Sequence, residues 1–252
     1  MPIEVRGSEG DGTVRTIRGA GCRGLRSAKR LPGTGVAVAY TLERSPERLL
    51  LNARGERVKQ QGAPADEAPP PVELPTTNFV QPRPWAFDAK TNRIFVAGSE
   101  NRFVIVDRTT QVIVSEGQLP CKQVDFDACA IGGMAWVSTK EGTFLQFDMA
   151  TCKVVGRTRL MDRNCDLRLT ISPSGRRLAA VAAAFVSATN HPTVAEIYAI
   201  ENGTLRRIAR TSTTLPGAVW DIALWDKQQT LLFASPYPSH VWEFGPTSSR
   251  SE

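Results

Sequence analysis

The sequence predicts an all-β protein built from repeated units of short strands, and two stretches of the chain carry this prediction. Residues 87–107 read Phe-Asp-Ala-Lys-Thr-Asn-Arg-Ile-Phe-Val-Ala-Gly-Ser-Glu-Asn-Arg-Phe-Val-Ile-Val-Asp, and residues 171–181 read Ile-Ser-Pro-Ser-Gly-Arg-Arg-Leu-Ala-Ala-Val. Both show an apolar strand, a polar turn and a second apolar strand, and in the first stretch a third strand ends at Asp107. Helical periodicity is nearly absent, because only residues 25–31 fit a turn or two of helix.

The unit recurs along the chain at intervals near 40 residues. Its third strand is predicted to end at Asp107, Asp148, Ile200 and Phe244, which gives gaps of 41, 52 and 44 residues. A polar, Pro-containing insert at 187–193 explains the longest gap. A less regular unit precedes these four, with strands at 35–41 and 48–52 and a Pro-rich connection at 62–75. Repeats of roughly 40 residues with four strands each predict a β-propeller of about five blades in a single domain over 1–252.

Two further features fit that architecture. The runs 103–106 and 231–234 are continuously apolar, which indicates strands buried on both faces, as in a blade between two neighbours. The last unit has three good strands and then a polar segment, 245–252, which we expect to be a disordered tail. We predict that the strand at 13–18 pairs with this last blade and closes the ring, because closure removes an exposed sheet edge. The alternative is a partner that completes the propeller.

Composition narrows the classes of function. The net charge is +6, and residues 1–60 hold 12 Lys and Arg against 6 Asp and Glu, so the excess lies in the first quarter. Such a basic patch suits RNA, an anionic lipid surface or an acidic protein, or is simply a solvated face. The five cysteines, at 22, 121, 129, 152 and 165, have no CxxC spacing and indicate reduced structural thiols in an intracellular, cytoplasmic or nuclear protein. No apolar run is long enough to span a bilayer, and we see no secretory signal.

The two stretches quoted above resemble WD40 or WD40-like (YVTN-type) β-propeller repeats, in which a third strand ends in Trp-Asp. Here that dipeptide is Val106-Asp107 or Phe147-Asp148. No unit carries the Gly-His pair of that family, so the resemblance does not extend to its Asp-His-Ser/Thr-Trp hydrogen-bond network. The resemblance implies a β-propeller fold and is almost silent on function.

Catalytic motifs are weak. The segment 19–24 reads Gly-Ala-Gly-Cys-Arg-Gly, which matches the G-x-G-x-x-G pattern of a dinucleotide-binding loop. The strand before it carries Arg15 and Arg18 and no long helix follows, so we interpret it as a glycine-rich loop between blades. Asp125 and Asp127 are alternate residues of one strand and share a face, where they either act as an acid–base pair, bind a divalent ion, or serve as turn and cap carboxylates. His191 and His240 are predicted to be exposed turn residues. We expect no cofactor, no metal and no catalytic residue.

The predicted function is therefore a non-catalytic scaffold subunit that binds a protein with an acidic segment. Connections between blades and turns between second and third strands would share one face and present basic side chains to the partner. Trp85 and Trp220 begin first strands, where each is either core or an aromatic contact at the rim. RNA binding through the basic first quarter and a propeller enzyme acting on a small molecule are the alternatives. The candidate contacts are Arg23, Arg83, Trp85, Arg102, Lys122, Lys140, Arg163, Trp220 and His240.

Overall fold

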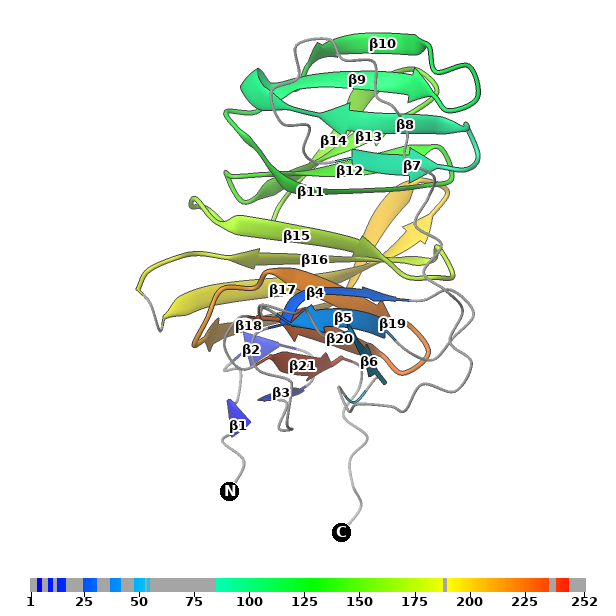
Figure 1. Cartoon of the computed structure of the whole chain (residues 1–252). Coiled ribbons are helices and arrows are strands. Elements are labelled where there is room, and N and C mark those ends of the chain that lie inside the picture. The colour runs from blue at the N-terminus through cyan, green and yellow to red at the C-terminus, as the bar shows by residue number, and fades with distance from the viewer. Residues whose placement is uncertain are drawn as a thin grey trace. The chain divides into compact units, whose positions relative to one another are not determined.

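The fold was determined as a computed structural model (Figure 1). The structure describes residues 85–187, 190–235 and 239–244, and, from the N-terminal region, residues 4–5, 9–10, 13–16, 25–30, 37–41, 48–52 and 54. The chain divides into two compact units, which we call unit 1 (residues 1–59 with 170–252) and unit 2 (residues 60–169). This division does not test the prediction that residues 1–252 form a single domain. The predicted connection at 62–75 and tail at 245–252 lie outside the described residues.

Unit 2 contains two four-stranded antiparallel sheets, each formed by strands in sequence order (Figure 1). The first sheet consists of β7 (Trp85–Asp88), β8 (Arg93–Ala97), β9 (Arg102–Asp107) and β10 (Ile113–Gln118). A 3₁₀ turn, η1 (Ser99–Asn101), joins β8 to β9. The second sheet consists of β11 (Val124–Ile131), β12 (Met134–Thr139), β13 (Thr143–Asp148) and β14 (Lys153–Arg159). In both sheets the last strand in sequence lies at an edge.

Unit 1 contains the remaining three sheets of the described residues. One is formed by β4 (Leu25–Arg30), β5 (Ala37–Thr41) and β6 (Arg48–Leu51). Another has the order β15 (Asp166–Ile171, whose last two residues belong to this unit), β16 (Arg177–Ala183), β17 (His191–Glu201), β18 (Thr204–Leu215) and β2 (Glu9–Gly10). The third has the order β19 (Asp221–Trp225), β20 (Thr230–Ala234), β21 (His240–Glu243), β3 (Thr13–Thr16) and β1 (Glu4–Val5).

These sheets confirm the all-β prediction, and within the described ranges the chain forms no α-helix. There is one sheet for each predicted unit, while the number of blades around a common axis stays a prediction. One boundary differs, since β17 begins at His191 inside the predicted insert at 187–193. His191 pairs with Leu215 of β18, so the longer hairpin absorbs part of the insert into the ladder.

The predicted pairing of the N-terminal strand with the last unit is confirmed. β3 lies antiparallel to β21, with Val14 opposite Trp242 and Arg15 opposite Val241. The neighbouring strand, β1, adds to the outside of β3. Without β3, the backbone groups on that side of β21 would form an open sheet edge.

Deleting residues 1–18 should therefore lower the melting temperature by about 5 °C, because roughly 2 kcal/mol of strand pairing is lost in a chain of this size. Thermal unfolding followed by far-UV circular dichroism measures the change. Deleting residues 247–252, which touches no described strand, is the control. An unchanged melting temperature in the first deletion would show that β3 does not support the fold.

The two inner strands of the first sheet, β8 and β9, are buried on both faces, as the continuous apolar run 103–106 predicts. Phe95, Phe103 and Ile105 point into a core shared with β12 and β13, where the Phe103 and Phe147 rings meet edge to face at 4.9 Å. Val96 and Val104 belong to a second cluster on the opposite face. The alternation of side chains along a strand places these residues on opposite faces.

In unit 1 one core joins the sheets of β16–β18 and β19–β21. It includes Val181, Ile197, Phe233 and Trp242, all of them inaccessible to solvent. Burial of these large apolar side chains is the main favourable contribution to the stability of such a layered β structure.

Asp107 and Asp148 end the third strands of the two unit 2 sheets and organise the turns that follow. One carboxylate oxygen of Asp107 accepts hydrogen bonds from the backbone N–H groups of Thr109 (2.9 Å) and Thr110 (2.8 Å). Asp148 accepts from Ala150 and Thr151 in the same way. The N–H of Thr110 lowers the pKa of Asp107, and that of Thr151 lowers the pKa of Asp148. In this chain the Asp of the repeat thus acts as a turn cap.

Candidate functional site

Four connections of unit 2 meet at the same end of its strands. They are the β8–β9 turn at η1, the β10–β11 connection, the β12–β13 turn and the β14–β15 connection. Asn101 of η1 donates its side-chain amide to the carbonyls of Cys121 (2.8 Å) and Lys122 (3.0 Å), and it accepts from the N–H of Val124 (3.0 Å). The η1 turn therefore fixes the path of the β10–β11 connection.

The β12–β13 turn is attached to the same connection. Glu141 accepts hydrogen bonds from the backbone N–H groups of Lys122 (2.7 Å) and Gln123 (3.0 Å). Gly142, with φ +72°, lies against the backbone of Met161 and Arg163 in the β14–β15 connection. These contacts confirm, within unit 2, that connections between sheets and turns between second and third strands share one end.

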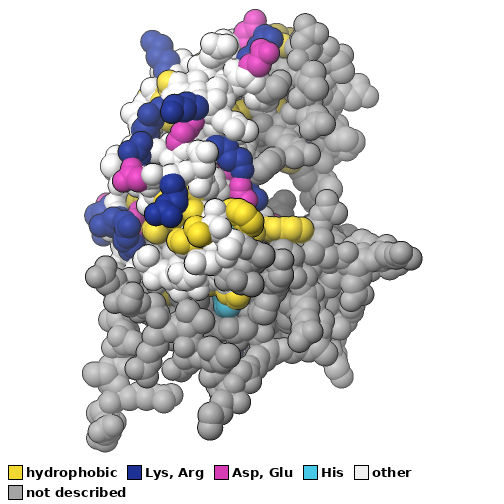
Figure 2. Space-filling model, turned by 90° about the vertical axis from the view of Figure 1, so that its left-hand side faces the viewer, with side chains coloured by type: hydrophobic (Ala, Val, Ile, Leu, Met, Phe, Trp, Pro, Cys, Tyr) yellow, Lys and Arg dark blue, Asp and Glu magenta, His cyan; other side chains and the backbone are white. Residues whose placement is uncertain are grey.

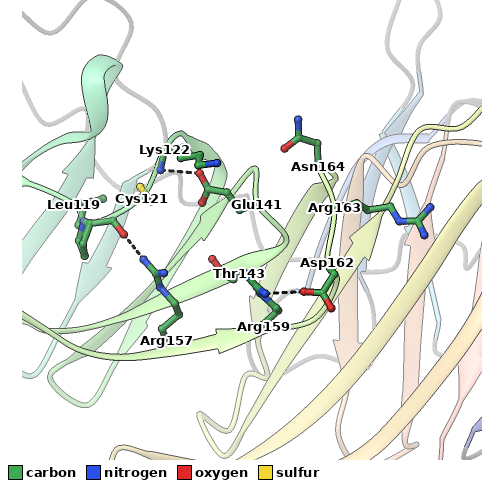
Figure 3. A pocket seen from close by; sticks show the side chains of 11 residues that line it. Leu119, Cys121, Lys122, Glu141, Thr143, Arg157, Arg159, Asp162, Arg163 and Asn164 are labelled. Carbon is green, nitrogen blue, oxygen red and sulfur yellow. Dashed lines mark hydrogen bonds and ion pairs between the residues drawn. The ribbon is translucent and has the colours of Figure 1, made fainter.

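Between these segments lies a pocket of about 580 Å³ (Figure 3). We call it the basic pocket. Its walls come from the β10–β11 connection, the β12–β13 turn with the first residue of β13, the edge strand β14 and the β14–β15 connection. The lining residues are Leu119, Pro120, Cys121, Lys122, Glu141, Thr143, Arg157, Arg159, Asp162, Arg163 and Asn164.

Cations outnumber carboxylates in the basic pocket, with four Lys or Arg side chains against Glu141 and Asp162. Arg157 donates to the Pro120 carbonyl, and Arg159 forms an exposed ion pair with Asp162 at 2.7 Å (Figure 3). Among the described residues, no ion pair holds the side chains of Lys122 and Arg163, and both are exposed. The pocket thus offers two uncompensated positive charges to a ligand.

The thiol in the basic pocket is not activated. Burial, together with the charge of Glu141, raises the pKa of Cys121 to about 11, so the thiol is protonated at neutral pH. The four described cysteines are free thiols, and burial also raises the pKa of Cys165, to about 12. In the part of the chain that the structure describes, no three His, Cys, Asp or Glu side chains are grouped to hold a metal ion. No described helix is long and apolar enough to cross a membrane.

Lys140 lies beside the pocket, and its ammonium group is held by two carboxylates. It forms ion pairs with Asp125 (3.0 Å) and with Asp166 of β15. Burial alone would lower the pKa of Lys140, but the hydrogen bond to Asp166 and the charge of Asp125 raise it above its ordinary value. The Lys140 side chain thus links the β12–β13 turn to β11 and β15, and its role as a partner contact stays a prediction.

Asp125 and Asp127 share a face of β11, as predicted, and both point at the backbone of β15. Asp125 accepts from the N–H of Leu167 (2.6 Å), and Asp127 accepts from the N–H of Leu169 (2.9 Å). Alternate carboxylates of one strand thus bind alternate amides of another. The acid–base and metal interpretations are not needed to explain these residues, because one oxygen of each carboxylate accepts from a backbone N–H and the other oxygen of Asp125 pairs with Lys140.

The other predicted contacts are dispersed. Lys122 and Arg163 line the basic pocket, whereas Arg102 forms an exposed ion pair with Glu116 at 3.8 Å. Trp85 and Trp220 are 52% and 37% exposed, so both are surface residues, while the tryptophans at 136, 225 and 242 are core. Arg23 and Arg83 lie outside the described residues. Sequence reasoning missed Arg157, Arg159, Glu141, Asp162 and Asn164; the alternation Arg157-Thr-Arg159 on a polar strand was the available signal.

The prediction that His191 and His240 are exposed turn residues is wrong. His240 is 1% exposed and begins β21, opposite Thr16 of β3, and His191 begins β17. The position that the sequence assigned to a turn is instead part of a strand paired with β3. His240 therefore presents no surface to a partner.

Burial lowers the pKa of His240 from 6.5 to about 4, which predicts loss of stability in acid. The unfolded chain takes up a proton below pH 6.5 while the folded chain does not, so stability falls as pH drops from 6.5 towards 4. The loss approaches about 3 kcal/mol. Urea unfolding at pH 7.5 and 4.5 measures it, and His240→Gln should remove most of the difference. If the native chain and His240→Gln lose equal stability between pH 7.5 and 4.5, His240 is not the cause of the loss.

The sequence matches no model of a known protein family, and no curated protein matches it. Solved structures do match, at low identity. The C-terminal WD40 domain of Sif2 aligns with a TM-score of 0.53 and 10% identity over 88% of this chain and 70% of that one. The WD40 β-propeller domain of Doa1 gives 0.47 and 14%, covering 90% and 65%. Kuenenia stuttgartiensis hydrazine synthase gives 0.46 and 14%, covering 86% and 58%.

The chain thus spans 58% and 65% of the hydrazine synthase and Doa1 chains that it matches. Identities of 10–14% carry no information on activity or partners. Together with the antiparallel four-stranded sheets and the turn-capping Asp107 and Asp148, the match to Sif2 establishes the architecture. The chain has a WD40-like β-propeller fold.

Proposed function

We propose that this protein is a non-catalytic interaction scaffold that binds an acidic segment of a protein partner in the basic pocket. The observation that carries the proposal is the pair of exposed cations, Lys122 and Arg163, which line a pocket of about 580 Å³ without a carboxylate partner among the described residues. Figure 3 shows the Arg163 guanidinium turned away from Lys122, so an extended acidic segment, with more than one carboxylate, would be needed to meet both charges.

The walls of the pocket favour binding without reorganisation. Asn101 and Glu141 hold the β10–β11 connection by hydrogen bonds to its backbone, so the segment that carries Lys122 is fixed before a ligand arrives. A prearranged site loses less conformational entropy on binding. The WD40-like fold supports a role in protein interaction in general, and four free thiols support the intracellular location predicted from the sequence.

A catalytic role has less support. The Cys121 thiol is protonated at neutral pH, and Asp125 and Asp127 are engaged by backbone amides. General acid–base catalysis requires a titrating group in reach of a substrate, and the charged groups that line the basic pocket are mainly cations.

The proposal predicts that reversing both free charges removes most of the affinity for an acidic ligand. Fluorescence anisotropy with a labelled peptide of eight glutamates should give a dissociation constant about tenfold higher for Lys122→Glu/Arg163→Glu than for the native chain. Lys227→Glu, an exposed cation of unit 1, is the control and should leave the affinity unchanged.

The same variants separate a protein ligand from RNA. A labelled single-stranded RNA of 20 nucleotides should bind the native chain and the double variant equally, or not at all. If the variant loses RNA binding with a steep dependence on salt while the peptide does not bind, the ligand of the pocket is a nucleic acid and the proposal fails.

A further inference from the structure

The basic pocket continues along an edge strand. β14 lies at the edge of its sheet, with β13 as its only neighbour in the described sheet. Its side chains alternate in exposure, and the outward series is Lys153, Val155, Arg157 and Arg159. The last two of these also line the pocket (Figure 3). A ligand held in the pocket therefore lies next to an edge strand whose outer backbone groups have no ladder partner in that sheet.

The charges of β14 determine which kind of strand can pair with its open edge. Three of the four outward side chains of β14 are cationic, although Asp162 already pairs with Arg159, and the fourth, Val155, is 55% exposed. Directly opposite residues of paired strands lie about 4.5–5.5 Å apart, so like charges repel and opposite charges attract. The edge of a second copy of β14 is excluded by repulsion. An extended segment with acidic side chains at alternate positions is favoured. On the face shown in Figure 2, Lys and Arg side chains recur over the described surface with Asp and Glu among them.

The strand is also irregular in a way that selects a flexible ligand. The register between β13 and β14 shifts between Gln146 and Phe147, which leaves Val155 as an extra residue on β14. Such a bulge bends and twists the strand. A preformed flat sheet does not follow that twist, whereas a single extended segment adjusts to it.

We infer that the partner's acidic segment binds as an added antiparallel β-strand along β14, with acidic side chains opposite Arg159, Arg157 and Lys153 and an apolar side chain opposite Val155. This inference rests on the proposed function, since it specifies how the same ligand is held. Backbone hydrogen bonds supply affinity, and the outward side chains of β14 supply the choice of sequence. The antiparallel direction gives the pattern acid-x-acid-x-apolar-x-acid.

The test uses the full chain and the labelled peptide Glu-Thr-Glu-Thr-Val-Thr-Glu, in the native form and in two backbone N-methylated forms. One form is methylated at the three Thr residues, and the other at the Glu and Val residues after the first. In an extended strand, alternate N–H groups point to the same side, so only one of the two sets can face β14. We expect one methylated peptide to bind at least tenfold more weakly and the other to bind within twofold of the native peptide.

A protein variant gives an independent readout. Lys153 lies on β14 but does not line the basic pocket, so Lys153→Glu should weaken the native peptide about fivefold only if the ligand follows the strand. Lys227→Glu is again the control. If both methylated peptides and Lys153→Glu leave affinity unchanged while Lys122→Glu/Arg163→Glu removes it, strand addition is wrong and the pocket function stands. If neither acidic peptide binds the native chain, the proposed function itself is overturned.

Discussion

Replacing Asp125 with Ala should lower the free energy of unfolding by about 2–4 kcal/mol, because the buried N–H of Leu167 loses its acceptor and the Lys140 ammonium loses one of its two carboxylates. Asp125 is 2% exposed, and it joins three segments of unit 2. Its carboxylate accepts from the N–H of Leu167 at 2.6 Å and pairs with the Lys140 ammonium at 3.0 Å. The variant leaves a buried N–H without its acceptor and reduces the compensation of a partly buried cation. Urea unfolding followed by the fluorescence of the buried tryptophans measures the loss.

Two further variants divide this effect between its causes. Asp125→Asn keeps an oxygen that can accept from Leu167 but loses the charge, so we expect a smaller loss than for Ala. The double variant Asp125→Ala/Lys140→Met removes both charges, and it should be more stable than the sum of the single losses by about 0.5–3 kcal/mol. Additive losses, or a cost below about 1 kcal/mol for Asp125→Ala, would show that the pair does not stabilise unit 2.

The Lys140 pair also has a signature in alkaline solution. Its pKa is raised above 10.5 in the folded chain, so its contribution is complete below the unfolded pKa. The contribution is lost as the pH rises through the folded pKa. The stability difference between the native chain and Lys140→Met should therefore shrink above pH 10.5 and stay constant below it.

The strands of this fold can be predicted from the sequence because their signals are local. The apolar run of β9 ends at Asp107, and an Asp followed by Thr residues at the end of a strand is itself a turn signal. The partner of β3 could also be predicted, because the last unit has only three strands of its own and the strand at 13–18 precedes the first unit without belonging to it. Both inferences need only strand patterns and the cost of an open edge.

The site could be predicted only in part, because it depends on which side chains meet across long separations. The shared face of Asp125 and Asp127 follows from alternation, but their backbone partners lie 42 residues away in β15. Nothing in the sequence distinguishes Lys140, which forms ion pairs with two carboxylates, from Lys122, which forms none among the described residues. His240 follows a Ser and resembles a turn residue, yet it begins a strand that pairs with β3 and its side chain is buried. Exposure and pairing are properties of the packed structure.

Replacing Gly142 with Ala should cost about 2–5 kcal/mol, combining backbone strain with overpacking. Gly142 has φ +72°, a conformation that an L-residue adopts only with strain. A Cβ atom here would overlap the carbonyl oxygen of Met161 and lie 3.2 Å from that of Arg163. Both neighbours are backbone atoms of the β14–β15 connection, which cannot move aside without shifting the Arg163 side of the basic pocket.

Gly132→Ala provides the matched control, because Gly132 has a similar φ of +67° but no atom within 4 Å of the place that a Cβ would occupy. It should show the strain alone, about 1–2 kcal/mol. The difference between the two variants in urea unfolding thus measures the steric effect where the β12–β13 turn meets the pocket. Gly142→Ala should also weaken binding of the acidic peptide, while Gly132→Ala should not. Equal effects of the two substitutions would mean that the β12–β13 turn yields freely, and that the close approach of Gly142 to Met161 does not position Arg163.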